Sequence, residues 1–300
     1  MNIALVLYAE QLGGHELMSI KLAKKIANCK KNITIFYPAG MANLSRFLDE
    51  LGDINSKEYN VLTTSNSYLI KFITRSWRRL IFTFQLKSNY DYVINCQGSF
   101  EQNWIFSFFC RIAHIKVASY VPYTSYPSER GSKLSRLRDY IHPFLLRLNL
   151  KFIVIHKFYK NHLIEEFNIK PSEILVINNE VSIKKIDHNP IKITEANDIK
   201  FVLPGRFYFP QKGQDILINS VKMLSSYKLN AKFLFIGDGP DKDNLYNLIK
   251  LNGLESYCKI SSWKTGLNEI YGSADCILLP SRYEGVSLVM LESILLNKPV

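Results

Sequence analysis

The chain alternates short runs of apolar, often β-branched residues with longer segments in which apolar residues recur at helical spacing. In the first half, the short runs predict strands at 2–8, 32–38, 90–96, 115–121 and 151–156. The segments between them predict helices at about 14–28, 43–51, 66–87, 101–113 and 133–149. Apolar strands that alternate with helices are typical of a parallel sheet covered on both faces. The pattern predicts an α/β fold.

The alternation restarts after the polar segment 183–198, which contains Pro190 and has no regular apolar period. The later runs predict strands within 199–207, 231–240, 258–263 and 275–281, and helices near 213–227, 241–253, 266–273 and 286–297. We therefore expect two Rossmann-like domains facing across a cleft. The first would span residues 1–185, the linker 186–198 and the second domain 199–300. Ligands of such sheets bind at the carboxyl ends of the strands.

Composition narrows the class of protein. In 300 residues, a hydrophobic share of 47% is enough for two cores. Five cysteines without a CxxC spacing favour a reduced, cytoplasmic protein over a zinc site or a disulfide framework. The first residues resemble a buried strand more than a signal peptide, and Arg111 and Lys116 interrupt the most apolar stretch, 103–121. We expect no transmembrane helix.

The net charge of +12 is concentrated in the first half, where residues 1–190 hold 25 Lys and Arg against 15 Asp and Glu. Segments 68–89 and 130–152 mix cations with Trp, Phe, Leu and Ile, as interfacial helices do. They suit docking on an anionic membrane leaflet. Alternatively, the apolar residues are core faces and the cations are the solvated faces. A basic half would also suit a nucleic-acid-binding protein, the alternative from another functional class.

Two cations follow the first strand of the second domain. Arg206 and Lys212 project from the loop before a helix, where an anion such as a diphosphate is favoured by free N–H groups and the helix dipole. A solvated basic loop is the alternative. Gly237 and Gly239 follow the next strand and allow close approach of a ligand or form a tight turn. The acidic residues of the string Asp241-Lys242-Asp243 lie in a helix's first turn, which favours capping over metal binding.

Two carboxylates, Glu284 and Glu292, stand eight residues apart around an almost wholly apolar stretch. We expect Glu284 in a loop and Glu292 about two turns inside the following helix. Carboxylates only accept hydrogen bonds, which suits a ligand rich in hydroxyl groups, such as a sugar and a ribose diol. The N–H groups of Gly285, Val286 and Ser287 would add contacts. Solubility of the helix is the alternative role for these two carboxylates. In the first half, Gly13-Gly14 resembles a phosphate-binding turn, and the alternative role for the adjacent Glu16 is to complement the helix dipole.

Together these segments resemble the retaining GT-B glycosyltransferases of family 4, the glycosyl transferases group 1. The matching pieces are "GGHE", "GR" with "KG" six residues after the Arg, "IGDGP", "IYGSADCILLPS" and "EGVSLVMLE". They follow the family's order and spacing. The resemblance is detailed over 200–300 and thinner over 1–190.

The resemblance implies a role for each matched residue. Arg206 and Lys212 would bind the donor diphosphate and stabilise the leaving group, Glu284 would bind the transferred sugar, and Glu292 the ribose hydroxyls. Gly14 would approach the phosphate and sugar, and Trp263 would lie near the base. The implied catalytic set is Arg206, Lys212 and Glu284; the donor-binding set is Gly13, Gly14, Gly205, Gly237, Trp263, Glu284, Gly285, Val286, Ser287 and Glu292. No metal and no cofactor are implied beyond a nucleotide sugar such as a UDP- or GDP-sugar.

The implied reaction moves a hexose-type sugar, with retention, to a glycan or lipid-linked acceptor in polysaccharide or glycolipid biosynthesis. From the cysteines and the basic first half we expect a cytoplasmic protein that lies peripherally on the inner face of the membrane, and no nucleic-acid partner. Many members carry a sugar-contacting His that "SYVPYTSYP" lacks, so Tyr120 or Tyr123 would replace it. Members also continue beyond "LLNKPV", which predicts an incomplete second domain. A GT-B sugar-nucleotide epimerase and a non-catalytic GT-B homologue are the nearer alternatives.

Overall fold

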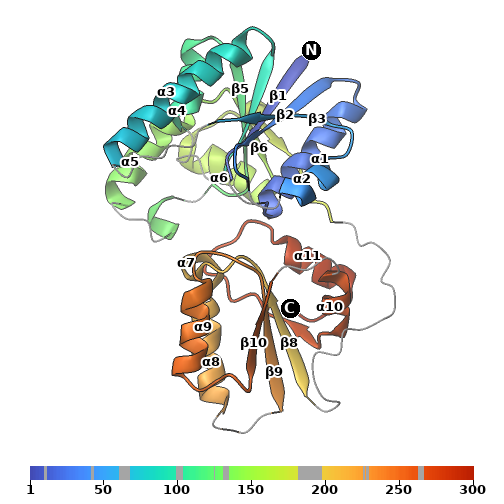
Figure 1. Cartoon of the computed structure of the whole chain (residues 1–300). Helices are drawn as coiled ribbons and strands as arrows, with labels where there is room; N and C mark the ends of the chain where they lie inside the picture. Colours follow the sequence, from blue (N-terminus) through green and yellow to red (C-terminus); the bar gives the residue numbers. More distant parts are fainter. Residues whose placement is uncertain are drawn as a thin grey trace. The chain divides into compact units, whose positions relative to one another are not determined.

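The computed structural model describes residues 1–9, 12–41, 44–60, 68–98, 104–124, 126–130, 135–181, 198–225, 227, 230–262 and 267–300. The chain divides into two compact units, residues 1–179 and 180–300, each built around its own parallel sheet (Figure 1). Most of the predicted linker, 186–197, lies outside the described residues, so the predicted domain boundaries stay predictions. The predicted α/β class is confirmed in both units.

The first unit holds a seven-stranded parallel sheet in the order β3-β2-β1-β4-β5-β6-β7. Its strands are β1 (Asn2–Leu7), β2 (Asn32–Pro38), β3 (Asn55–Tyr59), β4 (Tyr92–Cys96), β5 (Lys116–Val121), β6 (Lys151–Val154) and β7 (Ile174–Val176). The strand order reverses between β1 and β4, and in open α/β sheets ligands bind at the carboxyl edge of such a switch point. The Gly13-Gly14 turn follows β1 at this edge.

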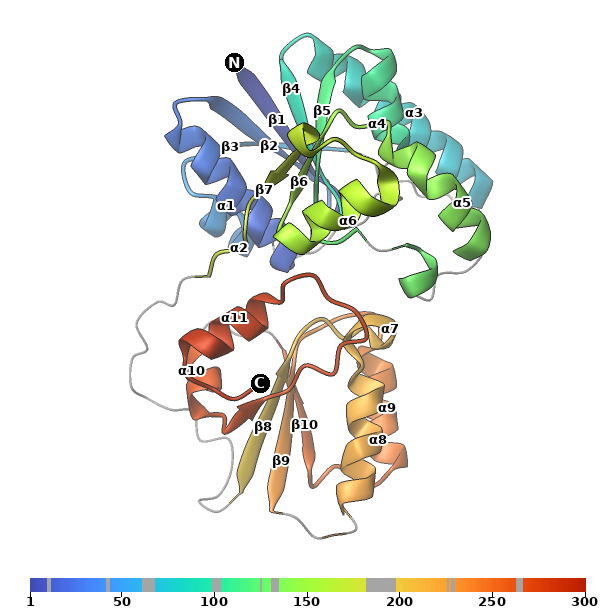
Figure 2. The ribbon, with the colours of Figure 1, turned by 180° about the vertical axis from the view of Figure 1, so that it is seen from behind.

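Six α-helices of the first unit are described: α1 (Gly14–Asn28), α2 (Leu44–Leu51), α3 (Tyr68–Lys87), α4 (Trp104–Ile112), α5 (Ser135–Leu146) and α6 (Lys157–Phe167). Phe82 of α3 and Phe106 of α4 share a core with Ala4 and Val93 of the central strands. A second core joins α5 and α6 to β6. Seen from both sides, α1 and α2 lie together, and α3, α4 and α5 lie along the opposite flank (Figures 1 and 2).

The second unit holds a four-stranded parallel sheet in the order β10-β9-β8-β11. Its elements are β8 (Ile199–Pro204), α7 (Phe209–Lys212), α8 (Gln214–Ser225), β9 (Ala231–Ile236), α9 (Lys242–Leu251), β10 (Cys258–Ser261), α10 (Leu267–Ser273), β11 (Cys276–Ile277) and α11 (Leu288–Leu295). Helices α8 and α9 pack on one face through Leu217 and Leu245. Helices α10 and α11 cover the other through Tyr271 and Val289. In this sheet, the order in which the strands follow one another along the chain reverses between β8 and β11.

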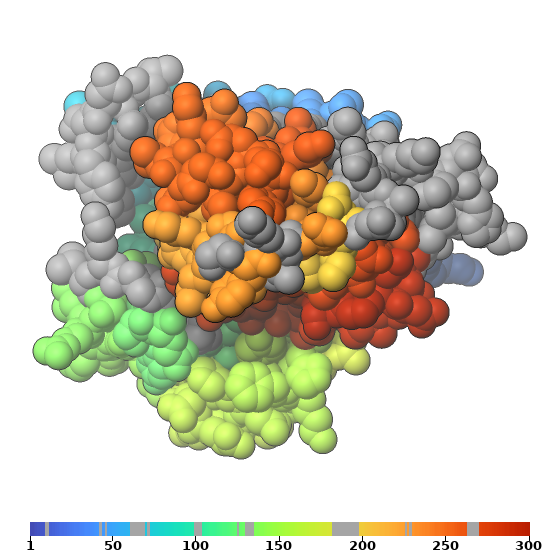
Figure 3. Space-filling model, turned by 90° about the horizontal axis from the view of Figure 1, so that it is seen from below, coloured from blue at the N-terminus to red at the C-terminus, as the bar shows by residue number. Residues whose placement is uncertain are grey.

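An apolar cavity of about 220 Å³ opens where β8 and β9 begin, lined among others by Phe201, Val221, Phe233 and Tyr257. Figure 3 looks onto this end of the second unit, in which β8, α8 and β9 are yellow to orange. The cavity lies at the amino ends of the strands, whereas ligands of such sheets bind at the carboxyl ends. It is therefore separate from the predicted site. In the described part of the chain, no helix is both long and apolar enough to cross a bilayer.

Candidate functional site

The candidate site lies at the carboxyl edge of the second sheet, at the switch point between β8 and β11. The loop after β8 leads to Lys212, and the loop after β11 leads to Glu284. The register pairs Pro204 with Ile236, so β8 and β9 end side by side. A Cβ atom on Gly237 would lie 1.9 Å from the Gly205 carbonyl oxygen. Gly237 thus lets two loops of this edge touch, and the donor-binding roles expected of Gly205 and Gly237 stay predictions.

Lys212 and Glu284 form an ion pair. Lys212 Nζ donates a hydrogen bond to Glu284 Oε1, and the Ser281 hydroxyl donates to the same oxygen at 2.8 Å. The two charged side chains are 18% and 25% exposed, so the pair is half-buried but reachable from solvent. An ammonium in such a position presents a point charge to an anionic ligand, while the carboxylate accepts from hydroxyl groups. The structure brings together two residues predicted to bind neighbouring parts of one ligand.

The junction between α7 and α8 supports this pair. Gly213 ends α7 with φ 67°, in the left-handed region that favours glycine. A Cβ atom there would lie 2.1 Å from the carbonyl oxygen of Pro280, near the beginning of the loop after β11. The backbone that carries Lys212 therefore meets the backbone that leads to Ser281 and Glu284.

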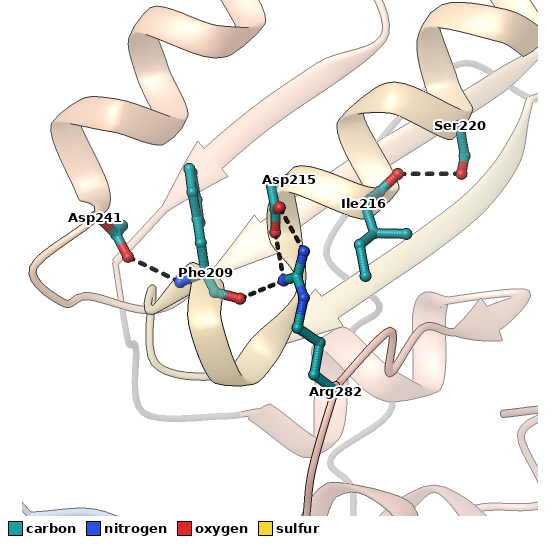
Figure 4. Close-up of polar contacts among 6 residues, drawn as sticks. All are labelled: Phe209, Asp215, Ile216, Ser220, Asp241 and Arg282. Carbon is teal, nitrogen blue, oxygen red and sulfur yellow. Dashed lines mark hydrogen bonds and ion pairs between the residues drawn. The ribbon is translucent and has the colours of Figure 1, made fainter. Parts of the chain in front are cut away.

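Arg282 holds the same loop against α7, and Figure 4 shows the contacts of its side chain. Its guanidinium donates two hydrogen bonds to the Asp215 carboxylate, at 2.8 and 2.7 Å, and one to the Phe209 carbonyl at 2.5 Å. Its backbone N–H donates to the Gln211 carbonyl at 2.7 Å. We call these four contacts the Arg282 clamp. A forked guanidinium–carboxylate pair fixes orientation as well as distance, so the clamp holds the segment 281–284 against α7.

Breaking the Arg282 clamp should loosen Glu284. The hydrogen bond from Arg282 lowers the pKa of Asp215, so the clamp's contribution to stability is complete above the unfolded Asp pKa of about 3.9 and is lost as pH falls through the lower folded pKa. At neutral pH we expect Asp215→Asn to raise the KM for a nucleotide-sugar donor several-fold. Steady-state kinetics would check this. Lys242→Gln removes an exposed ion pair with Asp238 in the same unit and is the matched control. An unchanged KM in Asp215→Asn would show that the clamp does not position Glu284.

Arg206 lies in the loop after β8 and is exposed. Its guanidinium carbon lies 5.0 Å from the Tyr208 ring centroid, in a cation–π arrangement. Its carbonyl accepts a hydrogen bond from the buried Gln214 side chain at 2.9 Å. The backbone at Arg206 is thus fixed by α8 while the guanidinium faces solvent. Its predicted role beside Lys212 stays a prediction.

Helix α11 begins later than the sequence predicts. Ser287 is its N-cap, and the Ser287 hydroxyl accepts from the Met290 N–H at 3.4 Å. Glu292 is therefore the fifth helical residue, little more than one turn inside rather than two. The predicted contacts of Gly285, Val286 and Ser287 stay predictions, with Gly285 and Val286 in the bend before the cap.

The Glu292 side chain lies beside Tyr271, a fully buried residue of α10. Burial raises the pKa of the Tyr271 hydroxyl, and the charge of Glu292 raises it further. Tyr271 therefore keeps its proton and gives Glu292 a neutral, rigid neighbour from the core. The sequence offered no signal for Tyr271, Asp215 or Arg282, although Arg282 stands two residues from Glu284.

Asp241 occupies the N-cap position of α9, but its side chain makes no capping bond to that helix. Its carboxylate instead accepts from the Phe209 N–H at 2.8 Å, at the start of α7 (Figure 4). The expectation of ordinary capping of its own helix is wrong for Asp241. The carboxylate caps the neighbouring helix instead and joins the loops after β8 and β9.

In the first unit, Gly13 is the N-cap of α1 and Gly14 its first residue. The Gly13 N–H donates to the Glu16 carboxylate at 3.0 Å, which closes the turn. The His15 ring lies 5.1 Å from that of Tyr120. Burial lowers the pKa of His15 to about 4, so the imidazole is neutral at physiological pH. The predicted donor-binding role of Gly13 and Gly14 stays a prediction. Trp263, which was expected near the base, lies outside the described residues.

Comparison with known proteins bears on the second unit most directly. Residues 198–300 match the family described as glycosyl transferases group 1. These are the residues that form the switch-point site. The matched residues include all four strands of the second sheet.

Curated relatives align with about half of the chain. The UDP-Gal:alpha-D-GlcNAc-diphosphoundecaprenol alpha-1,3-galactosyltransferase of Escherichia coli is 24% identical over 180 residues, covering 56% of this chain and 46% of that protein. The amylovoran biosynthesis glycosyltransferase AmsD of Erwinia amylovora is 29% identical over 156 residues, covering 50% of this chain and 42% of the relative. The matched regions thus span less than half of either relative's length.

Solved structures match over the whole chain. The lipopolysaccharide outer core galactosyltransferase WaaB has a TM-score of 0.64 at 19% identity, covering 100% of this chain and 79% of the other. Anabaena Alr3699/HepE in complex with UDP-glucose has a TM-score of 0.71 at 17% identity, with the same coverage of 100% and 79%. At such identities the likeness establishes the fold. The α/β fold with parallel sheets matches GT-B glycosyltransferase structures.

Proposed function

We propose that the protein is a retaining, metal-independent glycosyltransferase that moves a hexose-type sugar from a UDP- or GDP-sugar to a glycan or lipid-linked acceptor. The observation that carries the proposal is the Lys212–Glu284 pair at the switch point of the second sheet. It sets a cation for a diphosphate beside a carboxylate for sugar hydroxyls. The match of residues 198–300 to glycosyl transferases group 1 supports the assignment.

In this mechanism the protein's main work is electrostatic. Lys212, joined by Arg206, binds the donor diphosphate and stabilises the negative charge that grows as the glycosidic bond breaks. Glu284 accepts hydrogen bonds from the sugar hydroxyls and keeps the anomeric carbon close to the diphosphate. Glu292 accepts from the ribose diol. The leaving phosphate takes the acceptor's proton on the same face, so the configuration is retained without a protein nucleophile.

The acceptor and pathway are proposed from the relatives. The Escherichia coli relative is named for a diphosphoundecaprenol-linked acceptor, and the Erwinia relative for the biosynthesis of amylovoran. We therefore place this chain in cell-surface polysaccharide or glycolipid biosynthesis. A cytoplasmic location agrees with its five cysteines, all of which are free thiols.

The donor site can be tested by thermal unfolding of the full chain with UDP-, GDP- and ADP-sugars. A ligand at about 100 times its Kd stabilises the native state by about 2.7 kcal/mol, so the correct nucleotide should raise Tm by several degrees. Glu292→Ala should lower the affinity about tenfold or more, because hydrogen bonds to a charged acceptor are lost. Glu255→Ala, an exposed carboxylate before β10, is the matched control.

The outcomes separate the alternatives. If no nucleotide sugar raises Tm, or if Glu292→Ala responds as the wild type does, the donor site is wrongly assigned. Product analysis with a labelled donor then distinguishes transfer from epimerisation, because an epimerase leaves the label on the nucleotide. Stabilisation without any turnover would identify a non-catalytic homologue.

A further inference from the structure

Helix α3 carries an apolar stripe on its outer face. Ile70, Ile73, Trp77, Ile81 and Phe84 are between 45% and 61% exposed. Their spacing of three or four residues places them along one side of the helix. The opposite side is also apolar, because Phe82 and Leu86 pack in the core beneath. The core face therefore does not account for the stripe, and α3 presents apolar side chains both to the sheet and to solvent.

The outward apolar surface continues on the two neighbouring helices. Phe108 and Ile112 of α4 are 41% and 58% exposed, and Leu137, Tyr140, Ile141 and Phe144 of α5 are between 39% and 73% exposed. Helices α3, α4 and α5 lie along the same flank of the first unit (Figures 1 and 2). We call this set of eleven outward side chains the α3–α5 surface. Apolar patches of this kind on a soluble unit mark an interaction site.

Positive charge accompanies the α3–α5 surface. Residues 68–87, 104–116 and 135–150, which cover the three helices, hold ten Lys and Arg residues and a single acid, Asp139. Several of the cations are exposed, among them Arg75, Lys87, Arg111, Arg136 and Arg147. A hollow of about 660 Å³ beside α4 is lined by both kinds of side chain, including Phe108, Ile112, Arg111 and Lys116. The partner must therefore be both apolar and anionic.

We propose that the α3–α5 surface docks the protein peripherally on an anionic lipid bilayer. The isoleucines, Trp77 and Phe144 enter the boundary between headgroups and acyl chains, and the cations contact lipid phosphates. A second copy of this chain would bring two cationic surfaces together, which like charges oppose. A single-stranded nucleic acid could stack on the aromatic residues, but Ile70, Ile73 and Ile81 would face its charged backbone without an apolar partner. Docking is independent of the proposed catalytic function, although it would bring a lipid-linked acceptor to the enzyme.

The test is co-sedimentation of the full chain with phosphatidylcholine vesicles made with and without phosphatidylglycerol. We expect binding to be at least about tenfold stronger with phosphatidylglycerol and to weaken as salt rises. The variant Ile73→Ser/Trp77→Ser/Ile81→Ser should lower binding about tenfold or more, because its apolar contact with the bilayer is removed. Arg75→Gln/Lys87→Gln/Arg111→Gln should abolish the preference for phosphatidylglycerol.

The matched control removes exposed apolar side chains of the second unit. Met223, Tyr246 and Leu251 are between 61% and 83% exposed, and replacing all three by Ser should leave vesicle binding unchanged. Circular dichroism and the response of Tm to nucleotide sugar show whether each variant keeps its fold. Equal binding to both kinds of vesicle, or an equal loss in the control variant, would overturn the proposal. The proposal would also be overturned if the main effect of the substitutions on the α3–α5 surface were the loss of a dimer or of oligonucleotide binding.

Discussion

Replacing Lys212 by Met is expected to lower kcat/KM for the nucleotide sugar by about 10²–10³, the cost of removing one preorganised charge from a developing anion. In the structure the ammonium is held by Glu284 and is only 18% exposed, so it needs little reorganisation when a diphosphate arrives. Methionine keeps most of the side chain's apolar stem and removes the charge. Initial rates over a range of donor concentrations, at saturating acceptor, would measure the loss.

The loss has a second physical source that must be separated from the first. Lys212→Met also leaves the half-buried Glu284 carboxylate without its cation, which disturbs the loop that Ser281 and Arg282 hold. The variant Glu284→Gln has no carboxylate that could be left unpaired, so adding Lys212→Met to it isolates the effect of the ammonium itself. If Lys212 acts on the diphosphate, the double variant Lys212→Met/Glu284→Gln is much slower than Glu284→Gln alone. Equal rates of these two variants would assign Lys212 a purely structural role. Lys222→Met, on the exposed side of α8, is the matched control.

The sequence predicts most elements of this fold because their patterns are strong. The predicted helix at 14–28 is α1, and the predicted strand at 32–38 is β2. The missed strand β3, "NSKEY", is polar along most of its length because it forms the sheet edge and buries only Tyr59. β7 has three residues, too few for an alternation to show. Edges and short strands depend on their neighbours more than on their own pattern.

The candidate site was predictable residue by residue but not as an arrangement. Lys212 and Glu284 were both expected to bind the donor, yet nothing in the sequence indicated that they pair. Asp215 and Arg282 are 67 residues apart, and only the adjacency of β8 and β11 brings them together. The same limit applies to Asp241, whose carboxylate caps the neighbouring α7. Motifs specify which residues gather at an edge, while strand order decides which of them touch.

The amphipathic pattern of α3 shows a different limit. The sequence left two explanations for the mixture of cations and apolar residues at 68–89: a membrane face or an ordinary core face. Both explanations assume one apolar face, whereas the structure shows two, with Phe82 inside and Trp77 outside. When both sides of a helix are apolar, the sequence does not show which side faces the core. Only the fold shows which apolar side chains of α3 are buried and which are exposed.

Gly213→Ala is expected to destabilise the second unit more than Gly253→Ala, although both glycines have nearly the same backbone conformation. Their φ angles are 67° and 64°, so alanine costs about 1–2 kcal/mol of left-handed strain at either position. At Gly253 nothing lies within 4 Å of the added Cβ, whereas at Gly213 the Pro280 oxygen would be 2.1 Å away. Overpacking adds about 1–3 kcal/mol at Gly213 alone. The midpoint of urea unfolding, followed by circular dichroism in the full chain, measures the difference.

The clash in Gly213→Ala can be relieved only if the segment after β11 moves away from α7. That segment carries Ser281, Arg282 and Glu284, so relief of the clash pulls Glu284 away from Lys212 and strains the Arg282 clamp. We therefore expect Gly213→Ala to lose the rise in Tm that a nucleotide sugar gives, while Gly253→Ala keeps it. Equal stability of the two variants would contradict the close contact at Pro280. A destabilised Gly213→Ala that still responds fully to the nucleotide sugar would show that this contact serves packing and not the donor site.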